Sequence, residues 1–389
     1  MKGTKYLSDV LDVSQLRTGE LNIINAPCGC GKTTCAINKI AELASSPRKV
    51  LYLIDTANGC ERLAQEEKLT AAYHSYEDDI AGHFFTTELP ENEIIVATYA
   101  RFGTWVKKYP NFASHFEIIL CDEAHNLVQF AKYSPEPNYT SIARDAIYNA
   151  LILGGPIIVA ISATPRPLSY FDHRFYIPID KEQLRQYDNR EIIPYVSTQQ
   201  VLKELPREQR GALYVPRIRE MQTFEAEARA AGRRPICVWS TNNEEHPMTE
   251  EQLRVRQFIL DNEAVPPEYD LFIMNASCET AINIRSHMDF FIAHTTDKTQ
   301  LTQARGRYRG DLERLYVLDK QNGSIRIPEK YLNRSLDAAE KRAMRKELNL
   351  KNSHGNLLPW KELIPLLNNS GYITAEQNKQ GKGYLLIQR

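Results

Sequence analysis

The stretch that decides the fold is Ala26-Pro27-Cys28-Gly29-Cys30-Gly31-Lys32-Thr33-Thr34, between an apolar run at 21–25 and a helix-like segment at 35–43. Strand, glycine-rich turn and helix form the context that a phosphate-binding loop needs. Gly29 and Gly31 let successive N–H groups point at one anion, and the helix start adds positive partial charge. The general pattern G-x-x-x-x-G-K-[ST] has glycine where this chain has Ala26. We expect the loop to hold phosphates, with Lys32 between the β- and γ-phosphates and the Thr33 hydroxyl on Mg²⁺.

Composition sets broad limits on what the chain can be. Its 389 residues are enough for two or three domains, and 42% apolar with 25% charged residues is typical of a globular protein. The net charge of −1 gives no overall attraction to polyanions, but residues 320–389 hold 13 basic and 6 acidic side chains. The net charge of residues 320–389 is therefore +7, and that of the rest of the chain is −8. Such a tail indicates a local nucleic-acid surface or, as the alternative, a solvated helical face.

Cysteine usage and hydropathy bear on the compartment. The seven cysteines form no pair of C-x-x-C units, which argues against zinc, and unpaired thiols are typical of a reducing compartment. Residues 1–13 lack the apolar centre of a signal peptide, and no run reaches the ~18 apolar residues of a membrane span. We expect a cytoplasmic protein, nuclear if the host is eukaryotic, with no membrane partner.

Short apolar runs alternate with helical stretches over the first half of the chain. The strand-like runs are 50–54, 94–99, 116–121 and 157–161. The helical patterns are 60–69, 100–109 and 139–153. The runs are nearly continuous rather than alternating, which is typical of strands buried on both faces of a parallel sheet. This order predicts a doubly wound α/β domain over residues 1–180.

A second α/β domain is expected at 211–319. Before it, residues 181–210 are rich in Lys, Glu, Gln and Arg and contain one short apolar run at 192–196, so we expect a linker with some structure of its own. The strand-like runs of this domain are 212–215, 236–239, 271–274, 290–293 and 315–318. Its helical patterns are 217–231, 249–260 and 300–308. The remaining residues, 320–389, form a basic C-terminal extension. In it, helices at 335–348 and 360–367 precede two short strand-like runs around a glycine-rich turn, which indicates the end of a winged helix or a docking hairpin.

The second informative stretch is a buried strand that ends in two carboxylates, Asp122 and Glu123, about 90 residues after Lys32. Ligands bind at this edge of a doubly wound sheet. Asp122 can hold Mg²⁺ through its water shell, because Mg²⁺ favours few carboxylates plus phosphates. Glu123 can orient and deprotonate an attacking water molecule.

These motifs resemble those of superfamily 2 helicases of the DEAD/DEAH type, over about residues 20–310. The phosphate loop of that group, A-x-x-G-x-G-K-T, fits Ala26 to Thr33. Its later motifs D-E-x-H and S-A-T fit Asp122-Glu123-Ala124-His125 and Ser162-Ala163-Thr164. Its sixth motif, Q-x-x-G-R-x-x-R, begins at Gln303 and includes Arg307, but Gly310 stands where the last Arg is expected and Arg309 lies one residue early. This compressed form is similar to herpesvirus-type origin-binding helicases and to some phage and mobile-element relatives.

The resemblance implies two tandem RecA-like domains, with ATP and Mg²⁺ as cofactors and nucleic acid as partner, DNA favoured over RNA. Replication or mobile-element proteins are further partners that it indicates. The implied nucleotide contacts run from Pro27 to Thr34 and include Asn283 of the fifth motif. The implied catalytic residues are Lys32, Glu123, Gln303, Arg307 and Arg309. The implied coupling residues are His125, Ser162 and Thr164. The implied nucleic-acid contacts are Thr56, Thr98, Tyr99 and Thr280.

The function expected from these residues is that of an ATP-dependent helicase or translocase. Hydrolysis needs a positioned water molecule and positive charge around the phosphates, and arginines of the second domain are candidates to add that charge. Two alternatives stay open at this point. One is a nucleic-acid-stimulated ATPase that remodels protein–nucleic-acid complexes without unwinding, and the other is a nucleic-acid scaffold without catalysis. The sequence leaves the oligomeric state open.

Overall fold

The structure is a computed structural model that describes residues 3–65, 71–73, 93–132, 137–241, 243–278, 282–319, 325–350, 356–379 and 382–388. The chain divides into two compact units, Met1–Asp188 and Asn189–Arg389. None of the helices in the described ranges has the length and apolar character needed to cross a membrane.

The first unit is built on a parallel seven-stranded sheet with the order β3-β4-β2-β5-β6-β1-β7. Its strands are β1 (Leu21–Asn25), β2 (Val50–Ile54), β3 (Ala71–Tyr73), β4 (Ile94–Thr98), β5 (Ile118–Asp122), β6 (Ile157–Ser162) and β7 (Arg174–Tyr176). Nearly every residue of β2, β4 and β5 is buried, because both faces of the sheet are covered. The continuous apolar runs of the sequence are therefore these central strands.

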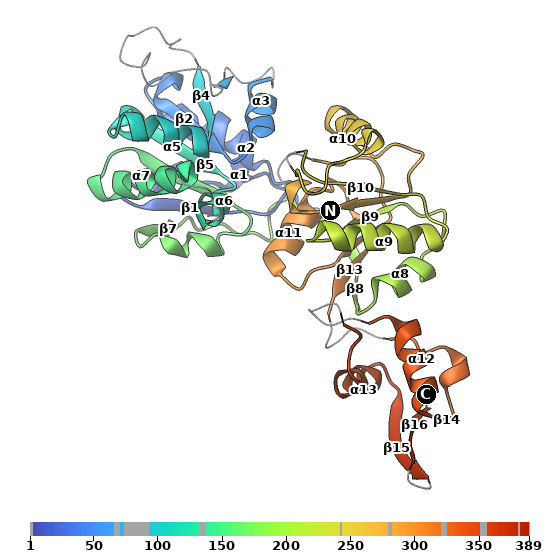
Figure 1. Ribbon diagram of the computed structural model, residues 1–389. Helices are drawn as coiled ribbons and strands as arrows, with labels where there is room; N and C mark the ends of the chain where they lie inside the picture. Colours follow the sequence, from blue (N-terminus) through green and yellow to red (C-terminus); the bar gives the residue numbers. More distant parts are fainter. Residues whose placement is uncertain are drawn as a thin grey trace. The chain divides into compact units, whose positions relative to one another are not determined.

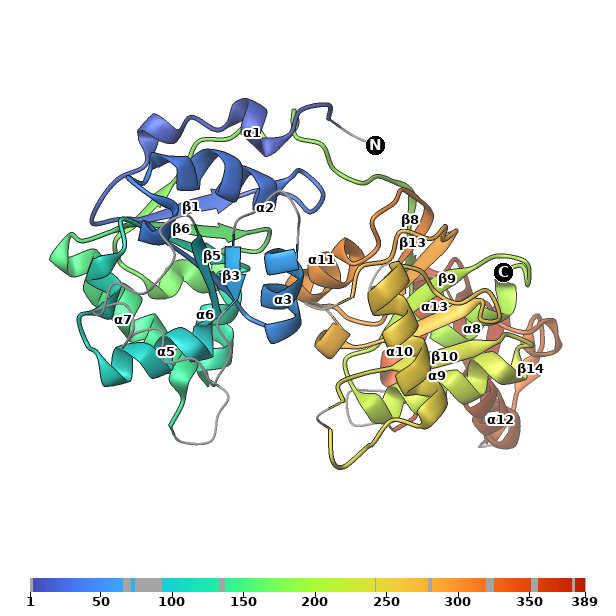
Figure 2. The same cartoon turned by 90° about the horizontal axis from the view of Figure 1, so that it is seen from above.

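Helices cover both faces of the first sheet, and Figure 2 shows the sheet between α2 on one side and α5 and α7 on the other. The helices are α1 (Leu7–Val10), α2 (Lys32–Cys35), α3 (Ala57–Gln65), α5 (Tyr99–Lys108), α6 (His125–Gln129) and α7 (Tyr139–Leu153). α2 continues as a π-helical turn at Ala36–Ile40. One apolar cluster joins the sheet to α5, α6 and α7, and another joins its opposite face to α1, α2 and α3. The sheet is thus the middle layer of three.

The second unit repeats this architecture with a parallel six-stranded sheet of order β10-β11-β9-β12-β13-β8. Its strands are β8 (Asn189–Tyr195), β9 (Gly211–Tyr214), β10 (Pro235–Val238), β11 (Leu271–Met274), β12 (Phe290–Ala293) and β13 (Leu312–Leu318). The helices that flank it are α8 (Thr198–Glu204), α9 (Ile218–Ala230), α10 (Glu250–Asn262) and α11 (Lys298–Gly306). The two parallel sheets with flanking helices confirm the predicted fold class of two tandem doubly wound domains.

Residues 181–210, expected to be a linker with some structure of its own, contain β8 and α8. β8 pairs in parallel with β13, which extends the second sheet by an edge strand. Most of its side chains are exposed or half-buried, as at an edge, and only Tyr195 is buried. The polar composition that indicated a linker therefore belongs to an edge strand and a surface helix.

The C-terminal residues form a small antiparallel sheet with the order β14-β16-β15. Its elements are β14 (Ser335–Leu336), α12 (Ala338–Leu348), α13 (Trp360–Asn369), β15 (Ile373–Lys379) and β16 (Lys382–Gln388), drawn in red in Figure 1. The helix expected at 335–348 starts at 338 because Asp337 caps it through a capping box with Glu340. These elements surround an apolar cluster of their own, which includes Leu336, Leu367 and Ile387.

Candidate active site

The loop after β1 has the backbone conformation that a phosphate-binding loop needs. Gly29 and Gly31 have φ values of 87° and 81°, in the left-handed region that favours glycine. A Cβ atom on Gly29 would lie 2.5 Å from Cε2 of Tyr187, and one on Gly31 would lie 3.2 Å from Cδ1 of Tyr6. Gly31 is also the N-cap of α2, so the helix starts at Lys32. The loop needs glycine at both positions, for conformation and for space.

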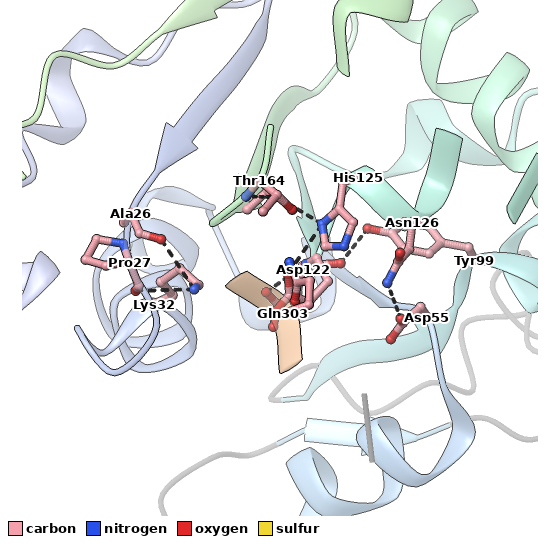
Figure 3. Close-up of polar contacts among 12 residues, drawn as sticks. Ala26, Pro27, Lys32, Asp55, Tyr99, Asp122, His125, Asn126, Thr164 and Gln303 are labelled. Atoms are coloured by element: carbon pink, nitrogen blue, oxygen red, sulfur yellow. Dashed lines mark hydrogen bonds and ion pairs between the residues drawn. The ribbon is translucent and has the colours of Figure 1, made fainter. Parts of the chain in front are cut away.

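The lysine of the loop lies over the loop's own carbonyl groups (Figure 3). Its Nζ is 3.4 Å from the carbonyl oxygens of both Ala26 and Pro27. Burial alone lowers the pKa of Lys32, but the nearby Cys28 and Glu123 outweigh burial, so the pKa is raised. The ammonium group therefore stays charged, and its long contacts leave it able to turn toward a phosphate.

The carboxylate of Asp122 ends β5 and is held from two sides. Tyr52 Oη donates to Asp122 Oδ2 at 2.7 Å, and the backbone N–H of Glu123 donates to Oδ1 at 2.9 Å. Tyr99 Oη donates to the carbonyl oxygen of Asp122 at 2.7 Å. Burial and then the charge of Glu123 raise the pKa of Asp122. A cation beside this carboxylate would favour its charged form.

The turn after Asp122 connects the acidic motif to the end of β6. Glu123 has a φ of 44°, which is uncommon for a residue with a side chain, and its Oε2 lies 3.5 Å from His125 Nδ1. His125 Nδ1 and Ser162 Oγ are hydrogen-bonded at 2.9 Å, and the Thr164 N–H donates to the same Oγ at 3.0 Å. The structure therefore brings together the three residues that the resemblance implies for coupling, and Figure 3 shows His125 beside Thr164.

A second polar link joins α6 to the end of β2. Asn126 Nδ2 donates to Asp55 Oδ2 at 2.5 Å (Figure 3). Asp55 directly precedes Thr56, which is an expected nucleic-acid contact. The start of α6 is thus connected by hydrogen bonds both to the Ser162–Thr164 segment, through His125, and to the segment after β2, through Asn126.

The expected nucleic-acid contacts of the first unit lie at the carboxyl ends of neighbouring strands. Thr98 pairs with Ile54 in the register of β4 and β2, so Thr98 and Thr56 come to the same edge. Thr98 Oγ1 caps α5, and Thr56 Oγ1 accepts from the N–H of Gly59 at 3.2 Å. Tyr99 differs because it is only 1% exposed and bonds to Asp122, so its side chain supports the acidic motif from inside. Thr280 lies outside the described residues.

The arginine motif of the second unit starts in α11 and continues past its end. The helix ends at Gly306, and Arg307 is its C-cap. Arg307 Nη2 lies 3.4 Å from Oε1 of Gln303, and Arg309 Nε donates to Asn283 Oδ1 at 3.0 Å. The expected residues of the fifth and sixth motifs therefore meet, and Arg309 lies beyond the helix.

Arg305 has a structural role within the second unit. Its guanidinium donates to Asn189 Oδ1 at 2.6 Å, to the Tyr308 carbonyl at 2.9 Å and to the Gly310 carbonyl at 2.8 Å. These bonds tie β8 and the loop after α11 to the helix. The sequence pattern alone does not separate this arginine from its two neighbours in the motif.

Two residues of the site, Tyr52 and Asn126, were missed by the sequence analysis. Both are polar groups in or beside buried elements, and a hydroxyl within the continuous apolar run 50–54 is the one signal that the sequence offers. Buried hydroxyls need hydrogen-bond partners, so a phenol in such a strand indicates a polar neighbour without identifying it.

Comparison with known proteins agrees with this arrangement. Residues 6–167 match the family model of the type III restriction enzyme res subunit. Among solved structures, a substituted form of S. cerevisiae Dbp5 bound to RNA and ADP BeF3 aligns with a TM-score of 0.50 and 12% identity, over 77% of this chain and 80% of that chain. S. cerevisiae Dbp5 bound to RNA and ADP BeF3 aligns over the same shares with 12% identity and a TM-score of 0.49.

No curated protein sequence matches the chain. The likeness to the first Dbp5 structure establishes the fold as two tandem RecA-like domains. The matched residues 6–167 include the phosphate loop, the acidic turn and the Ser162–Thr164 segment. The chain is thus similar to this family over residues 6–167, and its fold is that of two tandem RecA-like domains.

Proposed function

We propose that the protein is an ATP-dependent helicase or translocase that acts on nucleic acid, with DNA favoured over RNA. One observation carries this proposal: His125 of the D-E-x-H motif is hydrogen-bonded to the S-A-T segment, and Asn126, the next residue, is hydrogen-bonded to the segment after β2. The preference for DNA rests on the resemblance of the compressed sixth motif to origin-binding helicases.

The residues present fit a magnesium ion. The Tyr52 hydroxyl bonds to the carboxylate of Asp122, one of the two proposed ligands. A hydroxyl, a carboxylate and phosphate oxygens are the donors that Mg²⁺ favours. When bound, the ion would neutralise charge on the β- and γ-phosphates. Thr33 and Asp122 would hold it.

The side chains of the site divide the remaining work. Lys32 and the backbone from Pro27 to Thr34 would bind the phosphates, and Glu123 would orient the attacking water and accept its proton. Arg307 and Arg309 of the second unit would supply the positive charge that the transition state needs. Gln303, which Arg307 contacts, would complete this group, and Asn283 would hold Arg309 in place.

Nucleic acid would bind along the carboxyl ends of β2 and β4. Thr56, Thr98 and, from the second unit, Thr280 are the proposed phosphate contacts, because hydroxyl and backbone groups bind phosphates without reading bases. The Asp55–Asn126 bond would then carry a change at this edge to the D-E-x-H turn. His125, Ser162 and Thr164 would transmit it toward the end of β6.

The test compares ATP turnover with single-stranded DNA, duplex DNA, forked DNA and RNA, with the Glu123→Gln variant as the inactive control. We expect DNA to stimulate turnover more than RNA does, and forked DNA to be unwound. Stimulation without unwinding would favour remodelling of protein–nucleic-acid complexes instead. Equal turnover with and without every nucleic acid would contradict the proposal, and absence of hydrolysis would favour a scaffold.

A further inference from the structure

Tyr52 is a buried polar residue whose hydroxyl reaches a residue proposed to hold the metal. It lies in β2, has an exposed fraction of 0%, and pairs with Leu120 in the register of β2 and β5. Its Oη donates to Asp122 Oδ2 at 2.7 Å. The phenol therefore links β2 to the carboxylate at the end of β5.

The proton count at this oxygen fixes the direction of the hydrogen bond. A phenol has one proton, and Tyr52 gives it to the carboxylate of Asp122. Asp122 retains acceptor capacity on both oxygens. Its carboxylate thus presents oxygen lone pairs that are suited to a cation.

We propose that Tyr52 is a positioning residue, which holds the carboxylate of Asp122 in the orientation that a divalent cation bound with the nucleotide requires. This inference rests on the proposed function of the site. Residues that orient metal ligands typically change metal affinity by about 10- to 100-fold when they are removed. Tyr52 contacts the proposed ligand Asp122 and is neither a ligand nor a catalytic group.

The chain contains a matched control for this role. Tyr99 is also buried, at 1% exposure, and its hydroxyl also bonds to Asp122 at 2.7 Å. That bond is to the main-chain carbonyl and leaves the carboxylate untouched. Tyr52→Phe and Tyr99→Phe therefore remove the same group at similar burial, and only the first frees the side chain of the proposed ligand Asp122.

The experiment measures cation affinity in the full chain bound to a fluorescent, non-hydrolysable ATP analogue. Mg²⁺ is titrated by nucleotide fluorescence and Mn²⁺ by electron paramagnetic resonance. We expect Tyr52→Phe to raise the half-saturating cation concentration by about 10- to 100-fold. Nucleotide affinity in EDTA should be unchanged, and Tyr99→Phe should keep the parent cation affinity. Circular dichroism establishes that both variants are folded.

Parental cation affinity in a folded Tyr52→Phe variant would overturn the inference, as would equal losses in both variants. If Tyr52→Phe does not fold, a fluorotyrosine at position 52 takes its place. Its ¹⁹F resonance should move when Mg²⁺ is added to the nucleotide-bound protein, and an unmoved resonance would overturn the inference. A parent protein that binds nucleotide but no cation overturns the proposed function itself, which is a different result.

Discussion

The two units share one architecture but differ in the segments that come after their strands. β1 of the first unit and β9 of the second are both almost entirely buried within parallel sheets. After β1 the chain enters a loop with two glycines in the left-handed region, and after β9 it passes through Val215 and Pro216 into α9. Strand burial therefore determines the fold, and the residues just past the strand ends determine the chemistry.

The charges at the two sites also differ in sign. The first unit places Asp122 and Glu123 beside Lys32, and the second unit places Arg307 and Arg309 after α11. An acidic group suits a cation and an attacking water, whereas an arginine group suits phosphate charge. The comparison predicts that substitutions in either unit reduce turnover, through different steps.

The largest expected effect comes from the arginines of the second unit. Arg307→Ala and Arg309→Ala should each reduce nucleic-acid-stimulated turnover, by up to the ~10³- to 10⁵-fold known for arginine fingers. Nucleotide binding, measured by fluorescence, should change much less, because the first unit holds the phosphates. Arg309 can act in this way because it lies beyond the end of α11.

Arg305→Ala is the matched control for these variants. It leaves acceptors on Asn189, Tyr308 and Gly310 without their donor, so we expect a lower free energy of unfolding, by about 1–3 kcal/mol, and a smaller effect on turnover. Parental turnover in Arg309→Ala would mean that Arg307 alone supplies the charge.

The next largest effect is expected at the acidic turn of the first unit. Glu123→Gln keeps the shape of the side chain but removes the base, so turnover should fall by at least ~10²-fold while ATP and Mg²⁺ still bind. The variant should accumulate as a nucleotide-bound complex on nucleic acid, which filter binding measures. Lys32→Ala should instead lose nucleotide affinity as well as turnover. Near-parental hydrolysis by Glu123→Gln would assign the base to another group.

The third prediction concerns the loop that distinguishes the units. Gly29→Ala forces a side chain into the left-handed region and toward the ring of Tyr187, 2.5 Å from the added Cβ. The left-handed backbone conformation alone costs a residue with a Cβ about 1–2 kcal/mol of stability. Gly154→Ala is the control, because its φ is 68° and nothing lies within 4 Å of the added Cβ. Both variants should melt earlier in calorimetry, and only Gly29→Ala should bind nucleotide more weakly. Equal nucleotide affinity in the two would show that the loop tolerates the substitution.

The fold could be predicted where strands are long and buried. The runs that form β2, β5 and β11 can be identified because burial on both faces makes them continuously apolar. β7 and β14 were missed because they are three and two residues long and partly exposed, so no apolar run marks them. β8 was assigned to the linker for a similar reason, since an edge strand can carry polar side chains.

Those residues of the site that belong to sequence motifs could be predicted from the sequence. Lys32, Asp122 and His125 have fixed spacings along the chain, and these spacings can be read without coordinates. The bond from Tyr52 to Asp122 spans 70 residues and that from Asn126 to Asp55 spans 71. Such pairs are set by which strands become neighbours, and this depends on the packing of the whole sheet rather than on any local pattern.

The smallest expected effect tests whether the basic tail extends the binding surface. Arg342 and Lys346 are exposed on α12, and neither forms an ion pair among those found in the described residues. Each phosphate contact contributes roughly 0.7–0.9 to the slope of log affinity against log salt. Arg342→Gln and Lys346→Gln should each flatten that slope by up to this amount, as measured by fluorescence anisotropy with labelled DNA. The control is Arg254→Gln. It removes an exposed charge from α10, where Arg254 forms an ion pair with Glu268. If all three variants keep the parent slope, α12 is a solvated helix and nucleic acid is bound by the parallel sheets alone.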